Sequence, residues 1–337
     1  MITKPLLVIG VVLMSSAVLM LTAASTRAEP GFATGAKHAA STLHPVLLSS
    51  GLEGASGSAL GPGGALYVTE GAAGRISRVD PQTGAKTTFA TGLPKQVIPL
   101  GGAIDLAFIG ATAYALVTLV GPDVGGSAVV GIYRVDGPQS ATLVADIGEF
   151  ALLHPPATPF DVPTGLQFAM EPYRGGFLVT DGHHNRVLRV RLNGTVSVFR
   201  PFGNIVPTGL ALAGNTVYMT EAGPVPHTAE TGKVVSFGPK SGVTEVASGA
   251  SLLVDVEFGR GRRLYALSQG QFPEGGQPAE PALPNTGALV SVNEDGTFAV
   301  IVDGLNRPTS LELIGDTAYV VTLGGEIWRI DGVSSGD

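Results

Sequence analysis

The chain of 337 residues contains no cysteine. No disulfide can therefore hold its fold together, and no lipid-modified cysteine can anchor it to a membrane. Charged residues make up only 14% of the chain and aromatic residues only 6%. A chain of about 300 residues can still bury a large apolar core without cross-links. We therefore expect a folded domain that needs no disulfide.

Long helices are also disfavoured, because glycine and proline are the two worst residues in a helix interior. The chain contains 48 glycines and 24 prolines. The glycines do not recur at every third position, which excludes a collagen helix. The length alone would suggest two domains, but β-barrels and radial β folds often exceed the usual domain size. The composition predicts one mostly β domain.

Residues 1–28 have the features of a secretory signal peptide. Lys4 gives a positive start, an apolar run follows, and small residues before position 29 fit a cleavage site. The alternative is an uncleaved membrane anchor, because the run is nearly long enough to span a bilayer. We favour cleavage, since serines and other small residues dilute the run. This predicts a secreted or periplasmic protein without a membrane span.

Cleavage would leave an acidic protein. It would remove Lys4 and Arg27 but no acidic residue, so 18 Lys and Arg would stand against 27 Asp and Glu. Nucleic acids and anionic lipids bind concentrated positive charge. We therefore expect neither as a partner. Residues 29–43 are predicted to be a flexible segment before the domain, and residues 333–337 a tail.

One short pattern recurs six times, at intervals of about 50 residues. It consists of an aliphatic residue, any residue, Arg or Ser, and another apolar residue. The copies are Ile76–Val79, Ile132–Val135, Val187–Val190, Val234–Phe237, Leu289–Val292 and Ile327–Ile330. Turn-forming residues follow each copy, and a second β-rich run precedes it. Each unit reads as four antiparallel strands, which is the structure of a propeller blade.

The two ends of the chain indicate how the ring closes. Only seven residues follow Ile330, too few for a fourth strand in the last unit. Residues 46–49 read as a strand with no unit of its own. A β-solenoid is the alternative, but it would not need a strand from the other terminus. We predict a six-bladed β-propeller over residues 44–332, in which residues 46–49 complete the last blade and remove two sheet edges.

Residues 61–70 and 181–190 carry a family resemblance. On these stretches the sequence resembles the ScyD/ScyE family of secreted β-propellers. The second stretch is also similar to NHL repeats, whose strands meet at an Asp–Asn–Arg turn, in this chain Asp181, Asn185 and Arg186. The resemblance covers residues 44–332 and implies a six-bladed propeller. It implies no particular biochemical role.

Long loops are predicted on one face of this ring. The loop between the second and third strands of a blade shares a face with the connection to the next blade. The long segments 120–128, 150–162, 222–231 and 269–286 all belong to that face. Long loops on a rigid scaffold are where a binding site is expected. We expect a small molecule, a glycan or a protein partner there, although the Pro-rich part of the last segment could be a solvated spacer.

Polar residues of this face are the candidate binding residues. They are the acidic residues after second strands (Glu70, Asp181, Glu221), three histidines (His154, His183, His227) and hydroxyl residues near the inner strands (Thr164, Thr208, Thr309). The structural alternatives are that the glutamates pair with Arg75 and Lys233, that Asp181 fastens its loop, and that these hydroxyls, with that of Ser56, line the channel and bind water.

Two aspartates are candidate metal ligands. Asp105 and Asp255 occupy the glycine position of a recurring Pro-Thr-Gly pattern, in blades that lie across the ring from each other. Carboxylates and imidazoles around a channel mouth could bind a divalent cation such as Ca²⁺. The alternative, which we favour, is that each aspartate accepts N–H bonds from the neighbouring blade.

The chain lacks the usual catalytic signatures. It contains no His-Glu-x-x-His and no phosphate loop, and its one Gly-x-Ser-x-Gly match, Gly332–Gly336, follows the last predicted strand and is not a strand-to-helix elbow. Similarity to propeller lactonases of the gluconolactonase type implies a metal-binding glutamate in the first blade, but residues 54–57 contain none. We therefore predict a monomeric binding or scaffold protein. The second hypothesis is a metal-dependent hydrolase or lyase, with His154 or His183 as its base.

Overall fold

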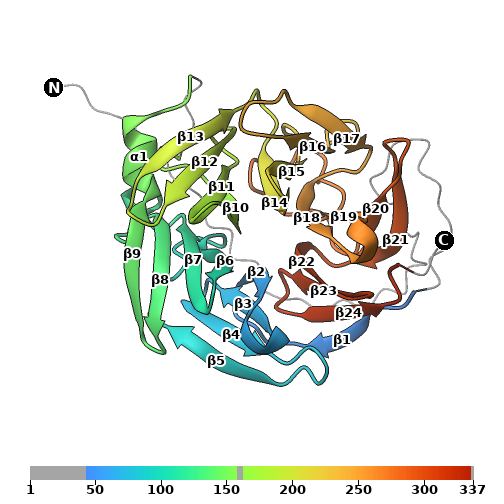
Figure 1. Cartoon of the computed structure of the whole chain (residues 1–337), viewed down its shortest axis with the longest axis horizontal. Coiled ribbons are helices and arrows are strands. Elements are labelled where there is room, and N and C mark those ends of the chain that lie inside the picture. Colours follow the sequence, from blue (N-terminus) through green and yellow to red (C-terminus); the bar gives the residue numbers. More distant parts are fainter. Residues whose placement is uncertain (1–42, 158–161, 335–337) are drawn as a thin grey trace.

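The computed structural model describes residues 43–157 and 162–334. The predicted signal peptide lies outside these residues, as do most of the predicted flexible segment and residues 335–337. The described residues form six four-stranded antiparallel sheets around a common axis (Figure 1). The all-β prediction and the number of blades are confirmed. None of the helices in the described ranges has the length and apolarity that a membrane span requires.

Each blade consists of four strands that follow one another from the axis outward. The first three blades contain β2 (Ala55–Leu60), β3 (Leu66–Glu70), β4 (Arg75–Val79) and β5 (Lys86–Thr91); β6 (Gly102–Ile109), β7 (Thr112–Thr118), β8 (Gly131–Gly137) and β9 (Ser140–Asp146); and β10 (Gln167–Pro172), β11 (Gly176–Asp181), β12 (Arg186–Arg191) and β13 (Val196–Pro201). The last three contain β14 (Pro207–Ala213), β15 (Thr216–Glu221), β16 (Lys233–Phe237) and β17 (Thr244–Ser248); β18 (Leu253–Phe258), β19 (Leu264–Ser268), β20 (Gly287–Val292) and β21 (Phe298–Leu305); and β22 (Pro308–Ile314), β23 (Thr317–Thr322), β24 (Ile327–Asp331) and β1 (Val46–Ser49).

The ring closes between β1 and β24, as the sequence predicts. The two strands are antiparallel, with Val46 opposite Arg329 and Leu47 opposite Trp328. Leu48 packs against the apolar cluster that contains Val68 of the first blade and Ile327 of the last. One strand from the start of the chain therefore supplies the outer edge of the last blade and also contacts the first.

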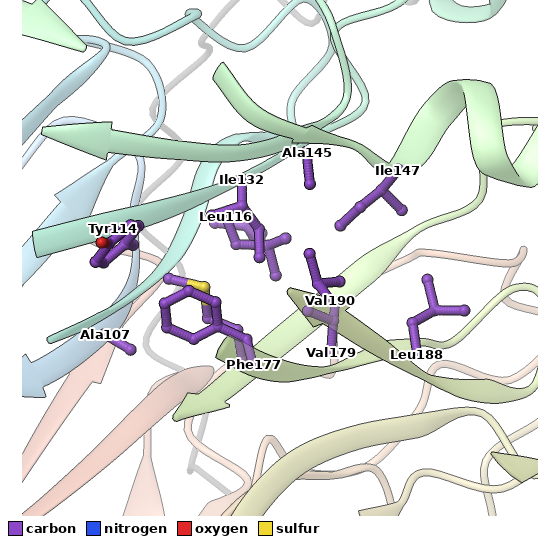
Figure 2. Packing of buried hydrophobic residues seen from close by; sticks show 12 residues of the cluster. Ala107, Tyr114, Leu116, Ile132, Ala145, Ile147, Phe177, Val179, Leu188 and Val190 are labelled. Atoms are coloured by element: carbon purple, nitrogen blue, oxygen red, sulfur yellow. The ribbon is translucent and has the colours of Figure 1, made fainter. Parts of the chain in front are cut away.

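The core lies between neighbouring blades, where their faces pack together. Figure 2 shows one such contact, between the second and third blades. The rings of Tyr114 and Phe177 lie 5.1 Å apart there, and Leu116, Ile132 and Val179 around them are buried. The second strand of each blade is apolar on both faces because a neighbouring blade covers each of them, which explains why these runs do not alternate.

A β-bulge near the start of every inner strand re-aims its side chains. In all six blades the register between the first and second strands shifts within the first four residues. Such bulges turn a strand locally and are frequent next to binding sites. In this ring they occur at the same level of each inner strand, where these strands surround the axis.

The segment 150–162 differs from the predicted loop. It begins inside a short helix, α1 (Ile147–Leu153), at the outer edge of the ring (Figure 1). The carboxylate of Asp146 caps this helix by accepting the N–H of Glu149 at 2.7 Å. The sequence contains this cap, but a helix of two turns is too short for its apolar period to be recognised.

Removing β1 should destabilise the ring. A chain that starts at residue 51 loses the pairing partner of β24 and exposes its edge, whereas a chain that starts at residue 43 keeps it. We expect the shorter chain to melt at least about 5 °C lower and to aggregate, since an unpaired edge strand recruits other chains. Equal melting temperatures of the two chains, measured by circular dichroism, would contradict this role of β1.

Candidate functional site

A cavity of about 650 Å³ occupies the centre of the ring. All six inner strands contribute to its wall. Its other lining residues come from loops between second and third strands, such as His183 and Gln269, or from connections between blades, such as Asn204. The cavity is therefore the propeller channel, and it opens on the face for which the sequence predicts long loops.

Hydroxyl groups line the wall nearest these loops. Ser56, Thr208 and Thr309 occupy matching positions at the start of three inner strands. The hydroxyl of Thr208 donates to the carbonyl of Leu253 at 2.8 Å, and that of Thr309 donates to the carbonyl of Ser56 at 2.8 Å. Each bond links one blade to the next, so these threonines fasten the ring as well as line the channel.

Thr164 does not belong to this group. The third inner strand begins only at Gln167, so Phe168 takes the position that the Pro-Thr-Gly pattern assigned to Thr164. The carboxylate of Asp123, in the long loop of the second blade, instead accepts both the N–H and the hydroxyl of Thr164, at 3.1 and 2.6 Å. The contact with Asp123 thus holds Thr164 outside the inner strand in which the local Pro-Thr-Gly pattern had placed it.

Asp105 and Asp255 lie in the wall and bind backbone groups. Asp105 accepts the N–H of Met170, in the next blade, at 2.7 Å. Asp255 accepts the N–H of Leu311, again one blade further on, at 2.7 Å. The other oxygen of each carboxyl accepts the N–H of the following residue, at 2.8 and 2.9 Å. These are the contacts of the structural alternative that the sequence favoured.

Two glycines make room for these aspartates. A Cβ atom on Gly57 would lie 2.3 Å from Oδ1 of Asp105, and one on Gly209 would lie 2.5 Å from Cα of Asp255. Real side chains never approach so closely. The glycine in one blade, the aspartate in the next and the N–H group in a third therefore form a unit that occurs twice in the ring.

Three further carboxyl groups in the channel were missed by the sequence analysis. Glu171, Glu257 and Glu312 line the cavity and occupy equivalent positions of their inner strands, opposite Leu178, Tyr265 and Tyr319. The signal was present, because acidic residues alternate with apolar ones in Val254–Phe258. It could not be used without the register of the bulges, which decides the facing of each residue.

The five carboxyl groups crowd one channel. Asp105, Glu171, Asp255, Glu257 and Glu312 are all half-buried, and no Lys or Arg occurs among the described residues that line the cavity. Burial raises the pKa of Glu171 to about 8 and that of Asp255 to about 7. Burial, together with the neighbouring carboxyl groups, raises the pKa of the other three well above the ordinary value. Most of these groups therefore hold a proton at neutral pH.

This arrangement does not fit a metal centre of the gluconolactonase type. Within residues 43–157 and 162–334, no three His, Asp or Glu side chains are placed to hold one ion. Both oxygens of Asp105 and of Asp255 are already engaged by N–H groups.

Two histidines lie at the loop end of the cavity. His183 and His227 both line it, from the third and fourth blades. Nδ1 of His227 lies 2.7 Å from the carbonyl oxygen of Gly223, which can only accept, so Nδ1 carries the proton. Burial lowers the pKa of His227 and keeps the ring neutral. Nε2 is then a hydrogen-bond acceptor, and no described residue donates to it.

His154 is not brought together with these two histidines. It follows α1, its side chain is exposed, and its ring stacks on Phe150 at 4.3 Å. It does not line the cavity. Its carbonyl oxygen accepts a hydrogen bond from Arg186 at 2.7 Å, so its contribution to the third blade comes from its backbone.

Asp181 fastens the loop that carries His183. Its Oδ2 accepts from Nε of Arg186 at 3.0 Å and lies 3.0 Å from Nδ1 of His184. The side-chain oxygen of Asn185 accepts two N–H groups of the next connection. These are the roles expected from an Asp–Asn–Arg turn. His184 points into this buried cluster, while its neighbour His183 faces the cavity.

Glu70 and Glu221 end equivalent strands but have different partners. Glu70 accepts two hydrogen bonds from Arg75, at 2.8 and 2.7 Å, and its side chain is fully buried. Lys233, the counterpart of Arg75, instead pairs with Glu245 at 2.6 Å. Burial raises the pKa of Glu221 to about 7. Neither glutamate lines the cavity.

Comparisons with known proteins support the fold. No family model matches the chain, and no curated protein matches its sequence. The structure is similar to a gluconolactonase from Xanthomonas campestris (TM-score 0.60, 13% identity, covering 90% of this chain and 95% of that one). It is also similar to virginiamycin B lyase from Staphylococcus aureus (0.52, 13%, 86% and 99%) and to a PQQ-bound aldose sugar dehydrogenase from Streptomyces coelicolor (0.53, 15%, 88% and 99%). At these identities the likeness establishes the propeller fold alone.

The channel carboxyls should make stability depend on pH. Their pKa is higher in the folded than in the unfolded state, so the folded protein binds more protons and loses stability as pH rises toward about 8. We expect the melting temperature to fall between about pH 5 and pH 8. Changing Glu257→Gln and Glu312→Gln together should reduce that fall, while Glu274→Gln with Glu294→Gln, both exposed, should not. An unchanged slope in the first variant would refute the burial effect.

Arg75 and Lys233 provide a second, matched comparison. Arg75→Ala leaves the fully buried Glu70 without its cation and should lower the free energy of unfolding by about 3 kcal/mol. Lys233→Ala removes a pair whose members are both about a third or more exposed, and should cost less than about 1 kcal/mol. Urea unfolding of both variants measures the difference, and similar costs would contradict the distinction.

Proposed function

We propose that this protein binds a small organic molecule in its central channel. The observation that carries the proposal is the cavity of about 650 Å³ at the centre of the ring. Ligand pockets typically measure about 300–1,000 Å³ and combine apolar walls with a few polar groups. A molecule in this channel would contact all six blades.

The chemistry of the wall supports a small ligand over a large one. Phe168, Leu252 and Val254 supply apolar surface, while Asn204 and Gln269 supply neutral polar groups near the loops. The side-chain oxygen of Gln269 accepts the N–H of Ala282 at 3.0 Å, which holds the long loop of the fifth blade beside the cavity. A glycan or protein on the outer loops would leave this interior surface unused.

We also propose that the protein is exported and that it belongs to the ScyD/ScyE family. Residues 1–28 support export, and residues 61–70 and 181–190 support membership of the ScyD/ScyE family. The ligand-binding protein would then act outside the cytoplasm, as a monomer, and meet its ligand there.

A second candidate function is catalysis without a metal. It is favoured by His227, whose neutral ring presents an acceptor nitrogen at the cavity. Nε2 could take a proton from a bound molecule while Nδ1 keeps its bond to Gly223, as a general base requires. The likeness to a lyase and to a gluconolactonase is compatible with this candidate. In this candidate, unlike simple binding, the bound molecule would be released as a reaction product.

A fragment screen with a blocked variant tests the proposal. Ser56 lines the cavity at the loop end, so Ser56→Trp should fill it and abolish binding of any channel ligand. Val198→Trp, at an exposed position of the outer strand β13, is the matched control and should bind normally. Ligand-observed NMR measures binding to each variant and to the unchanged protein for comparison.

One kind of result would contradict the channel as the binding site, and another would favour catalysis over simple binding. Ligands that bind Ser56→Trp as well as the unchanged protein, or the absence of any ligand, would refute the channel as the site. A product in the screen that disappears with His227→Ala, while binding persists, would replace simple binding by catalysis.

A further inference from the structure

We propose that the channel ligand is an organic amine, whose ammonium group lies among the five carboxyl groups and whose apolar part contacts the wall. This inference rests on the proposed function and specifies its ligand class. Two independent observations point to it: the cluster of carboxyl groups in the cavity, which no Lys or Arg faces among the described lining residues, and the unused acceptor at its loop end.

The first observation is the cluster of acidic groups. The titratable groups that face the cavity are five channel carboxyls (Asp105, Glu171, Asp255, Glu257, Glu312), one exposed carboxyl (Glu280) and two imidazoles (His183, His227). Among the described lining residues there is no Lys or Arg to neutralise them. A cation in such a channel favours ionisation of the carboxyls around it and is then attracted by those that lose their proton, and the low local dielectric strengthens each attraction. An anionic ligand would disfavour that ionisation and would find no Lys or Arg among the described lining residues.

The second observation is the hydrogen-bonding capacity of His227. The residue is only 7% exposed and lines the cavity. Its Nδ1 donates to Gly223, and none of the described residues donates to Nε2. Nε2 therefore offers an acceptor to an N–H group of a ligand in the cavity. The loop end of the channel can therefore bind a hydrogen-bond donor of the ligand.

An organic amine satisfies both observations better than a metal ion or a sugar. The carboxyls nearest the middle of the channel already accept N–H groups, which leaves no set of free oxygens to surround a metal among the described residues. A neutral sugar brings donors but no charge. Phe168, Met170 and Leu210 in the same wall offer contacts for hydrocarbon, which neither of those ligands uses well.

Binding of an amine should release protons. An ammonium group beside Glu171 and Asp255 favours their ionised forms and lowers the pKa values that burial has raised to about 8 and about 7. The complex then holds fewer protons than the free protein. Affinity for the amine should therefore increase as pH rises from about 6 to about 8, where the amine itself remains charged.

Three probes that share a phenylethyl group test the charge requirement. They are 2-phenylethylamine, 2-phenylethanol and 3-phenylpropionate, which carry a positive, a neutral and a negative end. Calorimetric titration at about pH 8 should give at least about tenfold tighter binding of the amine than of the alcohol, and no binding of the carboxylate. Ser56→Trp should abolish the binding, and Val198→Trp should not.

A charge-neutral variant locates the ammonium group. Glu257→Gln together with Glu312→Gln keeps the shape of the wall and should weaken the amine at least about tenfold, with the alcohol unchanged. Glu274→Gln together with Glu294→Gln, both outside the cavity, is the control. If the channel variant does not fold, proton release by the unchanged protein, measured in buffers of different ionisation enthalpy, decides the question.

The outcomes separate the inference from the function on which it rests. Four results would each contradict the proposal that the ligand is an amine. They are equal binding of amine and alcohol, preference for the carboxylate, absence of proton release, and displacement of the amine by equimolar Ca²⁺. If other screened molecules still bind in a manner that Ser56→Trp abolishes, the channel stays a binding site. Failure of every compound, both in the fragment screen and among the three probes, overturns both.

Discussion

The antiparallel pairing of β1 with β24 is the constraint on which the rest of the structure depends. It makes a closed ring of sheets that would otherwise end in two exposed edges. Only a closed ring surrounds the axis with inner strands from every part of the chain. Asp105 and Glu312 are more than two hundred residues apart, yet they line one cavity for this reason. The electrostatic character of the channel is thus a property of closure and of no single segment.

The blades could be predicted because their signals are local and repeated. Six copies of one strand pattern with turn residues after them require no long-range information, and the strand without a unit, Val46–Ser49, predicted closure. The residues that line the channel were harder to predict. Asp105 and Asp255 stood out within a repeated pattern, whereas Glu257 was hidden because its facing depends on a bulge. Thr164 was misplaced because Asp123, far away in sequence, holds it before the strand.

The polar residues of the loop face divide into two groups. Glu70 and Asp181 occupy the same blade position and are engaged by an arginine from the following strand, so they hold loops in place. His183 and His227 lie on loops held in this way or by backbone carbonyls, and they face the cavity. Residue type and spacing alone could not separate these groups, since acids and histidines occur in both. Partners across the blade decide the role of each.

The location of β1 also determines how the protein can be held on a surface. It is the outermost strand of its sheet, four strands from the axis, so the chain reaches the ring at its rim. A linker, affinity tag or fused domain placed before residue 43 would attach beside the blades and away from the channel mouth. Molecules immobilised by that end, on a sensor chip or on a cell envelope, would therefore keep the entrance open to solutes.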